Sequence, residues 1–393
     1  MENLNVKAII GEVFEDIARG METGSFGEKI ALGLTLYGSE LGEENLLRGA
    51  EEFARLYPDV EVVLIGPKMD TELTLVEVES EEVQYDKMEE LLDQGRIQGC
   101  VTMHYNFPIG VSTVGRMVTP GLGKKMFLAT TTGTTSPNRN EAMVRNAISG
   151  IITAKAMGIK NPSLGILNVD GARPVERALK ELSDGGYPIN FAESDRADGG
   201  AVMRGNDLLR GTPDVMVTDT LTGNLLVKTF SSFHTGGSYE SVGDGYGPGI
   251  GEDYNRLVLI LSRVSGSPVV VNALTYAKNL VEGKVHDVAK AEYKKVKDAG
   301  LDNILAGLNK SKAKPADEEE VVAPPEEITT GSIAGIDILE LEDAVRELWK
   351  AGIYATSGMG CTGPIVMVNE ERMQKATEIL AEAGYVAKEQ IDC

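Results

Sequence analysis

Short apolar runs alternate with amphipathic stretches from Lys29 to about residue 308, and this alternation most constrains the fold. Runs rich in Val, Ile and Leu are typical of strands buried on both faces. The runs predict strands over 29–36, 60–66, 99–103, 125–131, 163–169, 189–193 and 214–219. The stretches between them predict helices over 43–57, 81–94, 138–157, 173–183 and 253–263. Strands alternating with helices predict an α/β fold with a mostly parallel sheet.

The pattern divides the chain into four parts. Residues 1–28 have apolar side chains at helical spacing, which predicts an amphipathic helix that docks on its own domain or contacts another subunit. Residues 29–308 form the main α/β domain. Residues 309–327 are rich in Lys, Pro and Glu without an apolar period, which is typical of a flexible linker. Residues 328–393 predict a small α/β module with the order strand, helix, glycine-rich turn, strand, helix.

Composition excludes several classes of protein. The chain has 60 acidic and 38 basic residues, and its net charge of −22 argues against binding to nucleic acid or to anionic membranes. No apolar run is long enough to cross a bilayer. The three cysteines are too few and too scattered for a disulfide framework, which fits a reducing cytoplasm. The three histidines are also far apart, so we expect no metal site.

Two polar segments follow predicted strands and are candidate anion sites. The first precedes the helix that begins near Asn138 and contains Thr132, Gly133, Thr134, Thr135, Ser136 and Arg139. The second follows the strand over 214–219 and contains Asp219, Thr222, Gly223, Asn224 and Lys228. Hydroxyls and free N–H groups at a helix N-terminus bind phosphate readily. Ordinary capped helices are the structural alternative. If the fold brings both segments together, they form one phosphate site at a cleft.

Two histidines are candidates for proton transfer. His234 lies in the glycine-rich segment 231–251, which is long enough to be either functional or disordered. His104 follows the predicted strand that carries Cys100. Either imidazole can carry a proton near neutral pH, although a hydrogen-bonded structural role is the simpler interpretation for a single histidine.

Of the cysteines, Cys361 differs most from a structural thiol. It lies in "GMGCTGP", where glycines open space and successive turn N–H groups can stabilise a thiolate or an acyl oxyanion. Cys100 lies within the apolar run "GCVTM" and is typical of a small buried hydrophobic residue. Cys393 is the last residue and its presence is interpreted as incidental. The sequence therefore favours Cys361 as an acylated or redox-active sulfur.

Several stretches, in order from about Lys29 to about Val285, resemble the phosphate acyltransferases of phospholipid synthesis. They are "YGSELGEENLLRGAEEF", "DQGRIQGCVTM", "LGILNVDGA", "GGAVMRGNDLLRGTPDVMVTDTLTGNLLVKTF" and "RLVLILSRVSGSPVVVNAL". The resemblance implies a two-lobed, isocitrate/isopropylmalate dehydrogenase-like body with a cleft between its lobes. This sequence departs from that family at residues 37–40 and 104–108, and the linker and tail have no counterpart there.

The whole chain, with its "GMGCTGP" cysteine, is similar to the alpha subunits of component C of glycine/sarcosine/betaine reductase complexes. That resemblance implies that Cys361 carries acetyl as a thioester and passes it to phosphate, which makes acetyl phosphate. It implies phosphate as co-substrate and no permanently bound cofactor. It also implies a thiolase-like beta subunit and a selenoprotein A carrying a carboxymethyl group as partners. Self-association and a redox role for Cys100 stay open. The alternatives are a plain phosphate acyltransferase acting on carrier-protein thioesters and a non-catalytic scaffold.

Overall fold

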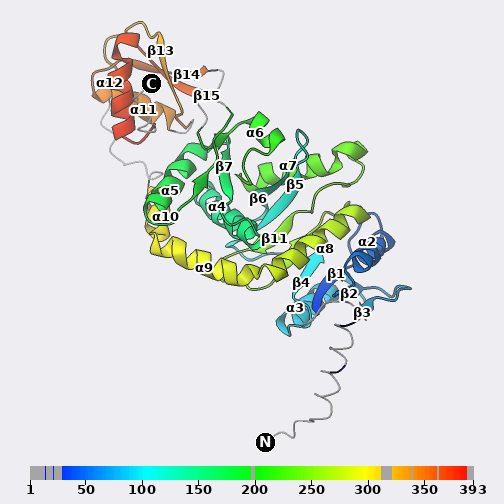
Figure 1. Cartoon of the computed structure of the whole chain (residues 1–393). Helices are drawn as coiled ribbons and strands as arrows, with labels where there is room; N and C mark the ends of the chain where they lie inside the picture. The colour runs from blue at the N-terminus through cyan, green and yellow to red at the C-terminus, as the bar shows by residue number, and fades with distance from the viewer. Residues whose placement is uncertain are drawn as a thin grey trace, which may run out of the picture.

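The computed structural model describes residues 14, 21, 29–195, 200–310, 321–337, 340–360 and 363–386. Apart from Phe14 and Met21, the predicted N-terminal helix lies outside the described residues. So do residues 311–320 of the predicted linker, Cys361 and Cys393. From residue 30 to residue 232 the described elements broadly follow the predicted alternation of strands and helices, whereas the helices between residues 267 and 310 follow one another without a strand between them (Figure 1).

The main body contains a sheet of twelve strands within the described residues. The strands are β1 Ile30–Thr35, β2 Val60–Gly66, β3 Thr74–Glu77, β4 Gly99–Thr102, β5 Val111–Val118, β6 Lys125–Thr134, β7 Ser163–Leu167, β8 Asn190–Phe191, β9 Val202–Met203, β10 Val215–Val217, β11 Gly247–Ile250 and β12 Val258–Ile260. Their order is β3-β2-β1-β4-β12-β11-β5-β6-β10-β7-β8, and β9 pairs with β7. Only β5 and β11 introduce antiparallel pairs, so the predicted α/β fold with a mainly parallel sheet is confirmed.

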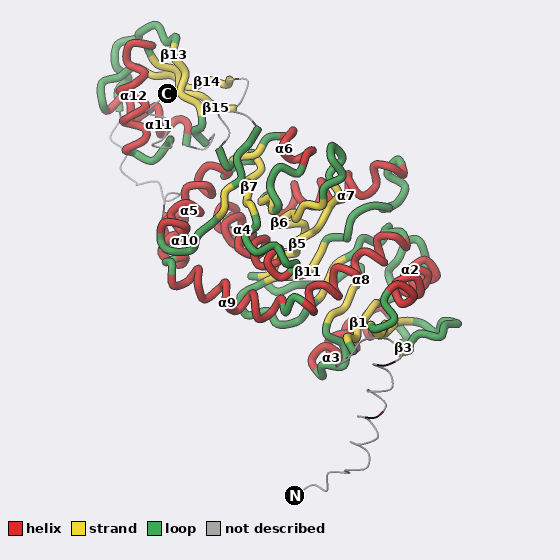
Figure 2. The backbone as a smooth tube through the Cα atoms, viewed as in Figure 1, coloured by secondary structure: helices red, strands yellow, loops and turns green. Residues whose placement is uncertain are grey.

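Helices cover both faces of this sheet (Figure 2). One face packs against α2 Glu43–Leu56, α4 Arg139–Ala156, α5 Ala172–Asp184, α8 Ser267–Glu282, α9 Val285–Asp298 and α10 Leu301–Lys310. The other packs against α3 Glu81–Asp93, α6 Gly205–Arg210 and α7 Thr220–Ser232. Neighbouring strand residues join opposite cores, as Leu32 and Ala31 do. The buried strands therefore read as continuous apolar runs because both of their faces are covered. None of the described helices is long and apolar enough to cross a membrane.

Two predictions for the main body are wrong. Residues 253–263 are not a helix, because Val258–Ile260 form β12 between β4 and β11 in the middle of the sheet. Leu257–Leu261 are all buried, and a fully buried run has no polar positions that would separate a strand from a helix. The predicted loop at Thr132–Ser136 also begins too early. Strand β6 continues to Thr134 because its end pairs with β5, a strand that was not predicted.

A second, three-stranded sheet follows towards the C-terminus. It contains β13 Gly331–Ala334, β14 Ala355–Gly360 and β15 Gly363–Val368, with α11 Leu341–Lys350 and α12 Met373–Glu382 packed on it around a separate apolar core. The predicted glycine-rich turn is wrong for residues 357–360, which form the end of β14 and pair with β15. Backbone hydrogen bonds across the hairpin outweigh the weak strand preference of glycine.

This C-terminal unit contacts the main body at α5 (Figure 1). The Gly171 N–H at the start of α5 donates to Asp337 Oδ2 over 2.9 Å. Arg177, further along the helix, lies 2.9 Å from the Glu340 carboxylate. The positive end of the helix dipole and the arginine both favour acidic partners. The unit is therefore held at the end of the sheet where β7 leads into α5.

Candidate active site

A pocket of about 330 Å³ lies at the carboxyl ends of β4 and β12, beside β6 and α7. Ligands of open α/β sheets gather at this edge of the sheet, because the chain leaves the parallel strands there and opens a crevice. The residues that line it are Met103, His104, Tyr105, Thr132, Asn224, Lys228, Tyr246, Ile260, Leu261 and Ser262. Three of the predicted anion-site residues, Thr132, Asn224 and Lys228, therefore share one pocket with His104.

The two segments predicted to form one site lie side by side. Asn224 Nδ2 donates to the Thr131 carbonyl oxygen over 3.0 Å, and Thr220 Oγ1 donates to the Gly133 carbonyl oxygen over 3.1 Å. Gly223 permits this approach, because a Cβ atom there would lie 1.7 Å from the Thr130 carbonyl oxygen. The absence of a side chain at this position thus places Asn224 and Lys228 against the end of β6.

We expect Gly223→Ala to destabilise the fold, because an added methyl group must push α7 away from β6. Overpacking of this kind costs typically about 1–3 kcal/mol and occasionally more. Gly307→Ala on α10 is the matched control, since no heavy atom lies within 4 Å of its would-be Cβ. That change should stabilise the protein by about 0.5–1 kcal/mol. Urea denaturation of both variants measures the difference. Equal stabilities would show that α7 does not need this close approach.

The helix N-termini near the pocket are already capped. Asp219 Oδ1 accepts from the Thr222 N–H over 3.1 Å, and its other oxygen lies 3.0 Å from Arg139 Nη2. These contacts help to keep the pKa of Asp219 below its usual value, against the effect of burial. Asn138 caps α4 through the N–H groups of Asn140 and Glu141. The capping interpretation thus accounts for Asp219, Thr222 and Arg139, which do not line the pocket.

Other hydroxyls of the first segment support the fold. Thr135 Oγ1 lies 3.1 Å from the Ala142 carbonyl oxygen, and Ser136 Oγ accepts from the Asn138 N–H over 3.1 Å. Both side chains are buried. Thr134 is exposed and, like Gly133, does not line the pocket. Thr132 is therefore the residue of this segment that faces the pocket.

Buried hydroxyls and a carboxylate build the wall behind the pocket. Thr131 Oγ1 donates to the Tyr246 carbonyl oxygen over 2.7 Å and lies 2.6 Å from Thr113 Oγ1. The Tyr246 hydroxyl donates to Glu240 over 3.0 Å, and so does the Ser265 hydroxyl. Burial raises the pKa of Glu240, while its hydrogen bonds and the nearby Lys228 act in the opposite direction. The glycine-rich segment 231–251 is thus fixed by buried polar contacts.

Lys228 gives the pocket its positive charge. It forms no salt bridge within the described part of the chain, and its side chain is exposed. The hydroxyls of Thr132 and Ser262 line the same space, and His104 lies exposed at its edge. A cation, hydroxyl donors and an imidazole can together bind a phosphate-sized anion and move a proton.

Three further predicted residues lie elsewhere or are not described. Cys100 is fully buried in β4, and burial raises the pKa of its thiol well above the usual value. His234 is exposed beside Phe233, outside the residues that line the pocket. Cys361 lies outside the described residues. No cluster of three metal-ligating side chains occurs among the residues that the structure describes.

Sequence reasoning missed Tyr246, Ser262 and Tyr105 as pocket residues. Ser262 fell within the wrongly predicted helix over 253–263, so it was not recognised as following a strand. A polar residue directly after the apolar run Leu257–Leu261 was the signal available for it. Tyr246 could not be found locally, because β11 is antiparallel and its neighbours are distant in sequence.

Comparison with known proteins defines the class of this chain. The profile described as "Fatty acid synthesis protein" matches residues 30–367. A phosphate acyltransferase of Geobacillus thermodenitrificans (strain NG80-2) is 25% identical over 234 residues, covering 49% of this chain and 68% of that protein. A branched-chain phosphotransacylase from Enterococcus faecalis V583 is 18% identical with a TM-score of 0.46, covering 64% of this chain and 99% of that one.

A more specific relationship extends over nearly the whole chain. The glycine/sarcosine/betaine reductase complex component C subunit alpha of Peptoclostridium acidaminophilum is 63% identical over 383 residues. The aligned region covers 98% of this chain and all of that protein. The chain therefore belongs to the fatty acid synthesis protein family and, within it, to the group that contains this component C alpha subunit.

Proposed function

We propose that this chain transfers an acetyl group from a thioester on Cys361 to inorganic phosphate, as a subunit of a glycine/sarcosine/betaine reductase complex. The pocket that combines Lys228, Thr132, Asn224 and His104 is the observation that supports the proposal most directly. It lies at the carboxyl edge of a parallel sheet in a chain whose distant relatives include phosphate acyltransferases. The pocket contains one ammonium group, that of Lys228, and this positive charge suits an anionic co-substrate.

Lys228 binds and orients the phosphate in this proposal. An ammonium group makes short, charge-assisted hydrogen bonds to phosphate oxygens. The Thr132 and Ser262 hydroxyls add donors from β6 and from the residues after β12. Asn224 holds α7 in place through its bond to the Thr131 carbonyl oxygen. Positioning phosphate beside an activated thioester supplies much of the rate enhancement, because the reaction becomes effectively unimolecular.

The reaction step is a nucleophilic acyl substitution. An oxygen of hydrogen phosphate attacks the thioester carbonyl carbon, so that a C–O bond forms and the C–S bond breaks. The products are acetyl phosphate and the free Cys361 thiol, which takes the proton of the hydrogen phosphate. His104 at the pocket edge carries this proton from oxygen to sulfur. No oxidant or reductant is needed, and no cofactor is permanently bound in this proposal.

The remaining subunits supply the thioester. We assign the chain a cytoplasmic location, a thiolase-like beta subunit as its direct partner, and a selenoprotein A carrying a carboxymethyl group as the source of the acetyl unit. The relative's name supports membership of a multi-component reductase complex. The location and the two partners are what the resemblance to component C alpha subunits implies. The net charge of −22 fits neither nucleic acid nor an anionic membrane as partner.

Arsenolysis of acetyl phosphate by the purified full-length chain tests the proposal. Acetyl phosphate should acylate Cys361 in the reverse direction, and arsenate should then remove the acetyl group as an unstable acetyl arsenate. We expect acetyl phosphate to disappear only when arsenate and the chain are both present. A non-catalytic scaffold gives no arsenate-dependent loss. A plain phosphate acyltransferase instead retains full activity on carrier-protein thioesters without Cys361.

A further inference from the structure

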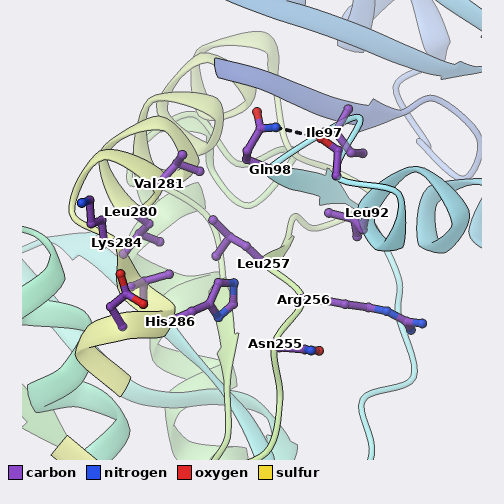
Figure 3. Close-up of a pocket in the computed structure, with 13 residues that line it drawn as sticks. Leu92, Ile97, Gln98, Asn255, Arg256, Leu257, Leu280, Val281, Lys284 and His286 are labelled. Atoms are coloured by element: carbon purple, nitrogen blue, oxygen red, sulfur yellow. Dashed lines mark hydrogen bonds between the residues drawn. The ribbon is translucent and has the colours of Figure 1, made fainter. Parts of the chain in front are cut away.

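A second pocket, of about 410 Å³, lies at the opposite ends of the strands that lead to the candidate active site (Figure 3). Gln98 and Leu257 directly precede β4 and β12, whereas His104 and Ser262 follow them. The wall is completed by the end of α3 and by the junction of α8 and α9. The two pockets share no lining residue.

The floor of this pocket is apolar. Its buried residues Ile97, Leu257, Leu280 and Val285 are at most 2% exposed. Val281 and Leu92 extend the apolar surface from α8 and α3. A cavity of this size with an apolar floor and a few polar groups matches the usual form of a small-molecule site.

Some polar side chains at the rim form hydrogen bonds or salt bridges within the chain, and others are free to contact a ligand. Arg256 extends away from His286 in Figure 3, and its guanidinium lies 2.8 Å from both Asp93 and Glu89. Gln98 Nε2 donates to the Gly95 carbonyl oxygen over 3.0 Å. In contrast, the Lys284 ammonium and the Asn255 amide have no side-chain partner within the described residues. Asp287 lines the rim as well, so the groups available there are one ammonium, one amide and one carboxylate, and Lys284 supplies the cation.

His286 adds a third group to this set. Its ring projects from the start of α9 towards the pocket, between Leu257 and Asn255 (Figure 3). Desolvation lowers the pKa of the His286 imidazole, although the residue is exposed, and the neighbouring Asp287 acts in the opposite direction. At least one ring nitrogen of an imidazole donates a hydrogen bond in either protonation state. The ring thus offers a directional hydrogen bond beside Lys284 and Asn255.

The backbone at Lys284 is the other unusual feature. Its φ of 49° makes it the only non-glycine residue with positive φ among the described residues. A residue with a Cβ atom is disfavoured in this left-handed conformation, where glycine or asparagine is the common choice. The backbone conformation at position 284 favours glycine or asparagine, so it does not explain why a lysine stands there at the pocket rim.

We propose that this pocket binds a small amphipathic anion, namely a carboxylate with a short hydrocarbon chain. Lys284 and Asn255 bind the carboxylate, His286 orients it, and the chain lies on the floor formed by Leu257, Leu280 and Val281. The site is separate from the acyl-transfer pocket and does not depend on the function proposed there. Burial of each methylene group adds to affinity, so binding should strengthen along the chain until the pocket is full.

Isothermal titration of the full-length chain with butyrate and hexanoate tests this site, with hexylamine and hexanol as matched probes. We expect saturable binding of hexanoate, weaker binding of butyrate, and at least tenfold weaker binding of the amine and the alcohol. Lys284→Gly should weaken hexanoate binding at least tenfold, because it removes the cation. The same variant should unfold at an equal or higher temperature, because glycine relieves the positive φ.

Two further variants locate the binding site. Val281→Phe should reduce hexanoate binding by filling the floor while leaving every charge in place. Lys228→Ala should leave hexanoate binding unchanged, because Lys228 lines the other pocket. Absence of saturable binding overturns the proposal. So does equal binding of the three six-carbon probes, or a loss of binding in Lys228→Ala but not in Lys284→Gly. None of these measurements requires acyl transfer, so either proposal can fail without the other.

Discussion

Cys361→Ala will abolish labelling of this chain by radioactive acetyl phosphate, whereas Cys100→Ala will leave the label in place. The reason is the accessibility and ionisation of the two sulfurs. Cys100 is fully buried, Gly33 packs directly against it, and burial raises the pKa of its thiol. A thiol is nucleophilic as its thiolate, so Cys100 is shielded and remains protonated. Cys361 lies in a glycine-rich stretch whose N–H groups can stabilise a thiolate.

The labelling experiment uses the full chain, gel filtration to remove free acetyl phosphate, and neutral hydroxylamine to release thioester-bound label. Cys393→Ala is the control for the third cysteine of the chain and should retain the label. Thermal unfolding of each variant verifies that the fold persists. The opposite pattern, with label retained in Cys361→Ala and lost in Cys100→Ala, would show that the buried sulfur carries the acetyl group.

Lys228→Ala will lower kcat/KM for phosphate by roughly tenfold to a hundredfold. A charge-assisted hydrogen bond contributes about 1.5–3 kcal/mol, and each 1.4 kcal/mol corresponds to a factor of ten. Lys228 is the lysine that lines the candidate active site, and it forms no salt bridge within the described residues. The acyl transfer from the Cys361 thioester to phosphate, followed at varied phosphate concentration, measures the effect.

Two further variants distinguish the effect of the Lys228 charge in the pocket from effects on the fold or on net charge. Lys228→Arg retains the positive charge and should recover part of the activity, because a guanidinium also binds phosphate but has a different shape. Lys290→Ala on the exposed side of α9 removes the same charge away from the pocket and should leave kinetics unchanged. If both alanine variants lose activity equally, Lys228 acts through net charge alone and the pocket is not the phosphate site.

The sequence determined the class of fold because burial on both faces leaves a local signature. The parallel strands β1, β2, β4 and β10 are continuous apolar runs, and the helices between them carry their own caps, such as Ser80 on α3 and Asn138 on α4. Apolar runs and helix caps can be recognised in the sequence without knowing which strand lies next to which. The end of β6 escaped prediction because Thr132–Thr134 become strand only by pairing with β5.

The candidate site was predictable in part. Thr132 lies near the end of β6, and Asn224 and Lys228 lie on the helix that follows β10, the parallel neighbour of β6, so their proximity followed from the strand pattern. Tyr246 and Ser262 did not follow from it. They reach the pocket because β11 and β12 pair in the centre of the sheet, and β12 inserts beside β4 although about 155 residues separate them in the chain.

The sequence by itself thus determined most of the buried parallel strands, the starts of several helices, and the short segments that carry polar groups, but it assigned the buried strand β12 to a helix. Apart from Thr132, Asn224 and Lys228, whose proximity the strand pattern indicated, only the tertiary structure decided which of those groups meet. It removed Arg139 and Asp219 from the pocket by pairing them with each other, and it assembled a second pocket around Lys284 from segments that carry no shared motif. The pattern of apolar and polar residues along a segment indicates whether that segment is buried, because each buried position requires an apolar side chain whatever its partner is. Strand pairing and helix junctions depend on contacts between distant segments, and no local pattern encodes which partner is chosen.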